Sequence, residues 1–112
     1  MTSFQSNLDK ANRYLERFRA EDVTNYINGE ASPAQDGATF ENITPVDLSK
    51  LCDVAHGKTA DIDLAAKAAY AAFKSWSAMP GTERKRILHA IADGIEARAE
   101  EIALIEAMDT GQ

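Results

Sequence analysis

The chain contains 112 residues with a formal net charge of -6; 45% of the residues are hydrophobic and 27% are charged. This length and composition suit one ordinary globular domain and argue against a disordered or collagen-like chain. The negative charge argues against a nucleic-acid partner, because phosphate binding requires clustered Lys and Arg. No apolar run approaches the ~20 residues that cross a bilayer, and the N-terminus lacks the pattern of a secretory signal. We therefore expect a cytoplasmic protein without a membrane partner.

The first predicted element is an amphipathic helix over residues 7–20. Charged residues surround one apolar stripe whose members recur at steps of three and four: Leu8, Ala11, Leu15 and Phe18. We expect this helix to pack on its own protein, and docking on a membrane surface or a partner is the alternative. Residues 1–22 are accordingly assigned to an N-terminal helical extension.

Short antiparallel strands are predicted between residues 23 and 56, where turn-forming residues interrupt the chain repeatedly. The strands are placed at residues 24–27, 39–43 and 51–55. The dipeptide Asn28-Gly29 suits the positive φ angles of a tight hairpin turn. Pro45 restricts Thr44 to an extended conformation and should end the second strand.

Helical patterns occupy the rest of the chain. One helix is predicted over residues 61–76, where six alanines between positions 65 and 72 keep its surface slim. The stretch from residue 82 to residue 108 is either one helix or two helices divided near Arg98, and Gly111 is placed as a left-handed cap. The period of its apolar residues predicts that one stripe is buried: Ile87, Leu88, Ile91, Ile95, Ile102 and Ile105.

The sequence offers few residues for chemistry, with no glycine-rich phosphate cradle and no His-Glu-x-x-His helix. Cys52 lies in a predicted strand beside Asp53, which favours a buried structural cysteine over a nucleophile. His56 and His89 lack an acid or ligand partner at suitable spacing and are assigned surface or packing roles. Asp109 sits at a helix end, where a carboxylate needs compensation, so it is either a cation ligand or a turn-forming residue. No catalytic or cofactor-binding residue is predicted.

Four stretches, in this order and spacing, resemble the N-terminal segment of the aldehyde dehydrogenase superfamily. They are Tyr26-Ile27-Asn28-Gly29-Glu30, Phe40-Glu41-Asn42-Ile43-Thr44-Pro45, Ala60-Asp61-Ile62-Asp63 with Ala72-Phe73-Lys74-Ser75-Trp76, and Glu83-Arg84 with Ile87-Leu88 and Asp109-Thr110-Gly111-Gln112. Where the family usually reads Asn-Pro-x-Thr-Gly, this chain has Thr44-Pro45-Val46-Asp47-Leu48. That departure is similar to the branch containing 5-carboxymethyl-2-hydroxymuconate semialdehyde dehydrogenase.

The resemblance implies an α/β fold in which residues 23–112 form the N-terminal part of a Rossmann-type NAD-binding domain. It implies a parent protein that oxidises an aldehyde or semialdehyde to a carboxylic acid with NAD or NADP, as a homodimer or homotetramer. The cysteine nucleophile and glutamate base of the family have no counterpart here, so the chain alone should be inactive. A small non-catalytic helical interaction module and a coenzyme A-acylating semialdehyde dehydrogenase are the alternatives.

The resemblance also implies a structural site for a monovalent cation. In the family such a site uses main-chain oxygens just before the proline that follows the second strand, together with the aspartate of an Asp-Thr-Gly motif. In this chain these positions are the carbonyls of Asn42 and Ile43 and the carboxylate of Asp109. Hard oxygen ligands suit Na⁺ or K⁺ rather than a redox metal.

The predicted apolar stripes have too few partners in the sequence, so we expect the chain to be part of a longer protein and marginally folded by itself. It should expose Phe73, Trp76, Ile91 and Ile95 and bind a hydrophobic dye, as molten states do. Dye fluorescence and a thermal melt test this. A sharp two-state melt without dye binding would contradict the expectation.

Overall fold

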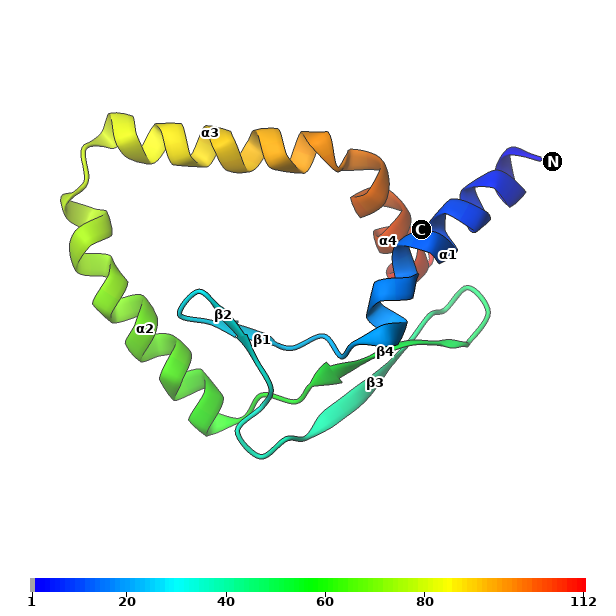
Figure 1. The fold of residues 1–112 in the computed structure, drawn as a ribbon, viewed down its shortest axis with the longest axis horizontal. Coiled ribbons are helices and arrows are strands. Elements are labelled where there is room, and N and C mark those ends of the chain that lie inside the picture. Colours follow the sequence, from blue (N-terminus) through cyan, green and yellow to red (C-terminus); the bar gives the residue numbers. More distant parts are fainter. Residues whose placement is uncertain (1) are drawn as a thin grey trace.

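The computed structural model describes residues 2–112 as an α/β arrangement of helices and antiparallel strand pairs. The elements in chain order are α1 (Ser3–Ala20), β1 (Asn25–Ile27), β2 (Glu30–Ser32), β3 (Thr39–Ile43), β4 (Lys50–Ala55), α2 (Thr59–Ala78), α3 (Gly81–Ala97) and α4 (Ala99–Thr110). Figure 1 shows them as an open ring: α2 and α3 form two sides, and α4 returns to α1 and the strands. The predicted α/β class is confirmed.

Helix α1 begins earlier than the predicted residue 7, because Thr2 caps it. The Thr2 hydroxyl accepts a hydrogen bond from the Gln5 amide at 3.1 Å and so satisfies one of the free donors of the first turn. The predicted apolar stripe is confirmed on the inner side of the helix, where Ala11 and Leu15 are buried. Immediately after the helix, Val23 pairs with Val54 of β4, which brings the chain onto the sheet.

Two antiparallel pairs form the β structure, β1 with β2 and β3 with β4. The predicted turn is confirmed: Asn28 has φ 56° and Gly29 has φ 78°, the combination that favours a tight hairpin. The strand after this turn, β2, was missing from the sequence prediction. In the second pair Asn42 faces Cys52, and the register shifts between Asn42 and Ile43. Thr44, which follows this irregularity, donates a hydrogen bond to the carbonyl of Met108 in α4.

Helix α2 is anchored by a buried carboxylate in its first turn. The two carboxylate oxygens of Asp61 accept hydrogen bonds from the amides of Gln35 and Lys58, each at 2.9 Å. The longer helical stretch divides at Arg98, as one of the two predicted alternatives had it, into α3 and α4. Arg98 has φ -113° and ψ 21°, which is not helical and changes the direction of the chain.

The core is small and lies where α1, β4 and α4 meet. Its members are buried residues from all three elements: Ala11, Leu15, Leu51, Cys52 and Met108. The predicted burial of the α3 stripe is wrong, since Leu88, Ile91 and Ile95 are 56%, 54% and 56% exposed. The helical period identifies the apolar side correctly, but no element within residues 2–112 covers it. The expected exposure in the isolated chain is confirmed for all four residues named for it: Phe73, Trp76, Ile91 and Ile95 are 62%, 38%, 54% and 56% exposed.

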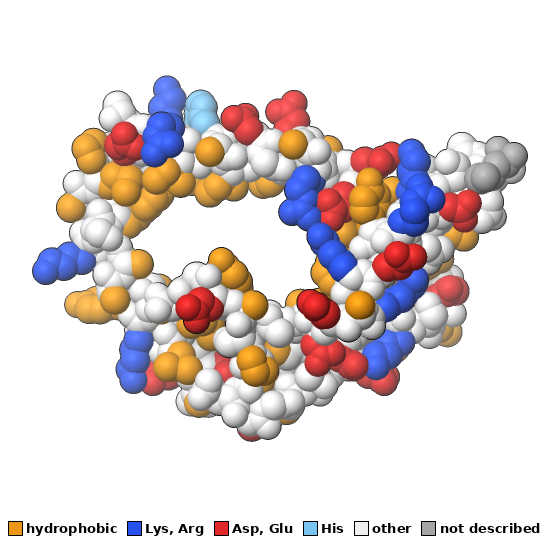
Figure 2. Space-filling model, in the orientation of Figure 1, with side chains coloured by type: hydrophobic (Ala, Val, Ile, Leu, Met, Phe, Trp, Pro, Cys, Tyr) orange, Lys and Arg blue, Asp and Glu red, His pale blue; other side chains and the backbone are white. Residues whose placement is uncertain are grey.

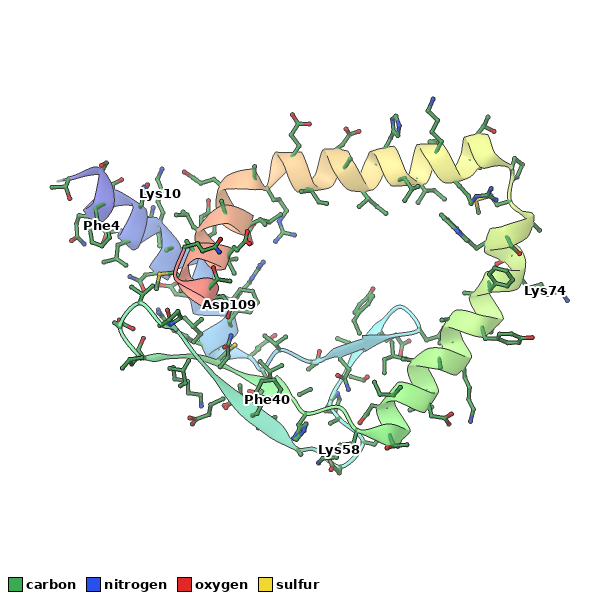
Figure 3. The ribbon with its side chains drawn as sticks, turned by 180° about the vertical axis from the view of Figure 1, so that it is seen from behind. Phe4, Lys10, Phe40, Lys58, Lys74 and Asp109 are labelled. Carbon is green, nitrogen blue, oxygen red and sulfur yellow. The ribbon has the colours of Figure 1, made fainter. Side chains whose placement is uncertain are left out.

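A ladder of charged side chains joins α1 to α4. Lys10 pairs with Glu100 at 2.8 Å, and the Tyr14 hydroxyl donates to the other oxygen of Glu100 at 3.1 Å. Two turns beyond Lys10 on α1, Arg17 pairs with Glu101 at 2.8 Å. Figure 3 shows Lys10 extending from α1 on the side of α4. The first helix therefore packs on the rest of the chain, and its assignment as a separate extension stays a prediction.

We predict that acid loosens this ladder. Hydrogen bonds from Lys10 and Tyr14 hold the pKa of the Glu100 carboxyl below its ordinary value. Because the folded pKa is lowered, the stabilising contribution is complete above the ordinary pKa of a glutamate and is lost as the pH falls through the folded value. The NMR shifts of the Tyr14 ring should follow this loss.

The Glu100→Gln variant should remove the acid-dependent shift of the Tyr14 ring, because glutamine carries no titrating carboxylate. Glu16→Gln is the matched control, since Glu16 is an exposed glutamate of α1 outside the ladder. An unchanged acid titration of Tyr14 in Glu100→Gln would show that the ladder does not control this contact.

Candidate functional site

The candidate site lies where the end of β3 meets the C-terminus of α4. Its central residue is Thr44, which is fully buried. The Thr44 hydroxyl donates to the carbonyl of Met108 and accepts from the amide of Val46 at 3.2 Å. A helix leaves its last four carbonyls without an intrahelical partner, so this hydroxyl satisfies one of them. The contact joins two segments that are 64 positions apart in sequence.

The end of α4 is shaped to approach the loop after β3. Gly111 has φ 80°, and its amide donates to the Ala107 carbonyl at 2.8 Å, which confirms the predicted left-handed cap. A Cβ atom at this position would lie 3.0 Å from Cγ of Pro45. Both the backbone conformation and the space therefore require glycine here.

The loop between β3 and β4 is held by its own hydrogen bonds. The amide of Thr44 donates to the Ser49 carbonyl, and the amide of Leu48 donates to the Thr44 carbonyl, both at 2.9 Å. Leu48 has φ 66°, which is unusual for a residue with a side chain, and it is 77% exposed. The hydroxyl and amide of Ser49 both donate hydrogen bonds to the Asp47 carboxylate, and these bonds lower the pKa of the Asp47 carboxyl.

Two of the three residues of the predicted cation site, Asn42 and Asp109, contact each other in this junction through their side chains. The side-chain amide of Asn42 donates to the Asp109 carboxylate at 2.7 Å, and Figure 3 shows Asp109 at the end of α4 that meets the strands. Ile43, the third, follows Asn42 in β3 at the register shift. The amide contact compensates part of the repulsion between the carboxylate and the helix end. The geometry thus brings Asn42 and Asp109 together through their side chains.

Cys52 belongs to the same region but is not suited to nucleophilic attack. It lies opposite Asn42 in the ladder of β3 and β4 and is buried. Burial raises the pKa of the Cys52 thiol, and the negative charge of Asp109 adds to this rise. A thiol with a raised pKa stays protonated at neutral pH, while attack requires the thiolate. The predicted buried structural cysteine is confirmed.

The two histidines are exposed and do not converge on the junction. The ring of His56 contacts Phe40 edge-on at 5.9 Å, and His89 lies on α3 beside Lys85 and Asp93. Across residues 2–112, no three His, Cys, Asp or Glu side chains gather as a metal site. That finding does not test the predicted cation site, because two of the three predicted ligands are main-chain carbonyls. None of the helices described is long and apolar enough to cross a membrane.

Among the described residues, one connection leads from a strand to a helix, between β4 and α2. This connection is not suited to binding a dinucleotide. Its only glycine is Gly57, and the amide of Lys58 at the start of α2 already donates to the carboxylate of Asp61. A pyrophosphate needs free amides at such a helix N-terminus. The positive-φ glycines lie elsewhere, at two turns and at the end of α4. No catalytic step can therefore be derived through a nicotinamide cofactor from these residues.

The fold recurs in known proteins. The profile described as the aldehyde dehydrogenase family matches residues 5–112, and the chain belongs to this family. It is 44% identical over 89 residues to the NADP/NAD-dependent aldehyde dehydrogenase PuuC of Escherichia coli K12. The matched region is 78% of this chain and 18% of PuuC. It is 38% identical over 92 residues to the 2-hydroxymuconic semialdehyde dehydrogenase of Pseudomonas sp. CF600, covering 81% of this chain and 19% of that protein.

Among solved structures, HpcC from Thermus thermophilus superposes with a TM-score of 0.90 at 36% identity, over 94% of this chain and 20% of HpcC. This match confirms the predicted fold, the N-terminal part of an aldehyde dehydrogenase cofactor domain. The chain therefore spans about a fifth of the length of these relatives.

We predict opposite effects for the same substitution at Gly111, which caps α4, and at Gly94, which lies inside α3. Gly111→Ala should destabilise the end of α4 by about 1–2 kcal/mol, because alanine is strained at positive φ. Its methyl group would also lie too close to the side chain of Pro45, 3.0 Å from Cγ. Gly94→Ala is the control: it has no neighbour within 4 Å in α3 and should stabilise that helix by up to ~1 kcal/mol.

Amide hydrogen exchange of α4 and α3 measures the two effects separately. Exchange in α4 should quicken in Gly111→Ala, and exchange in α3 should slow in Gly94→Ala. Unchanged protection of α4 in Gly111→Ala would mean that the helix end does not depend on the cap.

Proposed function

We propose that this chain is the N-terminal scaffold portion of an NAD(P)-dependent aldehyde dehydrogenase that converts an aldehyde or semialdehyde to a carboxylic acid. Family membership across residues 5–112 is the observation that carries this proposal. The similarity to PuuC, an NADP/NAD-dependent aldehyde dehydrogenase, supports the use of NADP or NAD. In such an enzyme the nicotinamide supplies the acceptor for hydride when it is bound.

The contribution of this chain is positional, because its own residues offer no nucleophile or base for the reaction. Cys52 is buried and its pKa is raised, and both histidines are exposed away from the junction. Thr44 and Gly111 instead hold the end of α4 against the loop after β3. The chain alone is therefore expected to turn over no aldehyde.

The proposed substrate class is a semialdehyde of aromatic catabolism, such as 5-carboxymethyl-2-hydroxymuconate semialdehyde. The similarity to a 2-hydroxymuconic semialdehyde dehydrogenase supports this class. The departure of Thr44-Pro45-Val46-Asp47-Leu48 from the usual family sequence supports it further. A cytoplasmic homodimer or homotetramer is proposed with it, from the family resemblance.

We also propose that the junction holds a structural Na⁺ or K⁺ ion through the carbonyls of Asn42 and Ile43 and the carboxylate of Asp109. The support is the position of Asp109, a carboxylate at a helix end, beside the register shift of β3. A cation there would neutralise the repulsion between this carboxylate and the helix carbonyls. The Asn42 amide takes one carboxylate oxygen, which leaves the other for a cation.

The test is an assay of the longest polypeptide that the reading frame of this chain encodes. We expect it to reduce NAD or NADP with a muconic-type semialdehyde, and we expect the 112-residue chain to be inactive. Acetaldehyde serves as the comparison substrate. Lack of nicotinamide reduction by the longer polypeptide with every aldehyde would overturn the proposed activity, and a preference for acetaldehyde would overturn the substrate class.

The same polypeptide tests the cation. Its melting temperature should be higher in NaCl or KCl than in choline chloride at equal ionic strength, and Asp109→Asn should remove the difference. Asp93→Asn is the control, because Asp93 is an exposed aspartate of α3 far from the junction in sequence. Equal melting in all three salts would contradict a cation site.

A further inference from the structure

The corner between α2 and α3 is a part of the fold that neither the core nor the Thr44 contact reaches. Helix α2 ends at Ala78 and α3 begins at Gly81, so only Met79 and Pro80 join them. Figure 1 shows this corner on the side of the ring opposite α1 and α4, where the core and the junction lie. Contacts at the corner itself therefore set how the two helices meet.

The backbone at the corner leaves the end of α2 without a cap of its own. Met79 has φ -66° and ψ 137°, and Pro80 has φ -55° and ψ 143°, so both are extended. The left-handed glycine that ends many helices, and that ends α4 at Gly111, is not used by α2. The last turn of α2 also contains no basic residue. Because the last four carbonyls of a helix have no intrahelical partner, the end of α2 needs a donor from another element.

Arg84 supplies this donor from the start of α3. Its terminal nitrogen Nη1 donates to the carbonyl of Trp76 at 3.3 Å, to that of Ser77 at 3.5 Å, and to that of Met79. A Cβ atom at Gly81 would lie 4.0 Å from Nη2, so the guanidinium folds back over the first residue of α3. A positive charge at the C-terminal end of a helix is also stabilising. One side chain thus links α2, the connection and α3.

The two basic residues that follow Arg84 are engaged elsewhere or lie at the surface. Figure 2 shows Lys and Arg side chains at the surface where α3 begins, and Lys85 and Arg86 line the outer side of that helix with His89. The Nε atom of Arg86 pairs with the Glu83 carboxylate at 3.0 Å. The acidic neighbour of Arg84 therefore binds another cation, which leaves the Arg84 guanidinium to the carbonyls.

We propose that Arg84 is a positioning residue that fixes the angle between α2 and α3, and that Met79 and Pro80 act as a hinge when its contacts are removed. Hinges are usually a few residues at the ends of elements, which absorb the change in φ and ψ. The two extended residues between Ala78 and Gly81 match that description. This inference does not rest on the proposed activity, substrate or cation.

The first test uses the longest polypeptide that the reading frame of this chain encodes and replaces Arg84 by Met, which keeps an unbranched stem but donates no hydrogen bond. Amide hydrogen exchange in residues 73–79 should become roughly tenfold faster, because the end of α2 loses a charged donor. Arg84→Lys keeps the charge on a shorter side chain and should give roughly threefold faster exchange. Arg86→Met is the matched control: it removes a guanidinium that contacts Glu83 instead, and exchange in residues 73–79 should not change.

The second test measures the angle through the distance between two spin labels, one on α2 and one on α3. The labels are attached to keto amino acids at positions 67 and 93, so that native cysteines need no replacement. Lys67 and Asp93 are both exposed. Arg84→Met should shift or broaden the distribution of label distances, and Arg86→Met should leave it as in the unchanged polypeptide.

Faster exchange with an unchanged label distance would show that Arg84 only caps α2, and would overturn the proposal. Unchanged exchange in Arg84→Met, or equal effects of Arg84→Met and Arg86→Met, would overturn it as well. Should Arg84→Met fail to fold, Arg84→Lys decides: exchange and label distances equal to those of the unchanged polypeptide would contradict a role for the three-carbonyl contact. None of these measurements depends on aldehyde oxidation, so they fail or succeed separately from the proposed activity.

Discussion

The hydrogen bond from Thr44 to the Met108 carbonyl is the contact on which the rest of this structure depends. Between these two residues the chain runs through β4, α2 and α3 and returns along α4, so the contact closes a circuit of 64 positions. Closing so long a segment costs conformational entropy, which grows slowly with length and must be offset where the ends meet. The fully buried hydroxyl, the Asn42 to Asp109 contact and the fit of Gly111 against Pro45 supply that stabilisation in one place.

This concentration explains why the ring is open and yet ordered at its junction. Buried apolar residues gather where α1, β4 and α4 meet, and the ladder of Lys10, Tyr14 and Glu100 adds polar contacts between α1 and α4. Helices α2 and α3 extend from it with a carboxylate anchor at one end, Asp61, and the break at Arg98 at the other. Their positions are therefore set by the ends of the helices rather than by packing along their length.

Local signals were sufficient to predict most elements from the sequence. Asn28-Gly29 predicts its turn because few dipeptides tolerate two positive φ angles, and Gly111 predicts a helix end for the same reason. Strand β2 was missed because Glu30–Ser32 has no hydrophobic alternation; its pairing follows from the turn alone. The start of α1 was missed because Thr2 acts through one capping bond, which apolar periodicity does not register.

The candidate site was predictable only in part. Asp109 was identified because it is a carboxylate at a helix end, and the family resemblance added Asn42, which lies beside it in the structure. Thr44 was interpreted only as the residue before a proline, since its role depends on a carbonyl that is 64 positions away and leaves no local pattern.

The wrong prediction for α3 follows the same logic and bears on what this chain does. Helical period reports which side of a helix is apolar, whereas burial depends on whether another layer lies against that side. In this chain the apolar sides of α2 and α3 are arranged toward one opening by a junction that holds their ends at a defined separation. The proposed scaffold role draws on both properties: a closure that sets the spacing, and an exposed apolar surface. The stability of the junction and the exposure of the helices are therefore linked. A ring that collapsed to bury the apolar sides of α2 and α3 would no longer expose them.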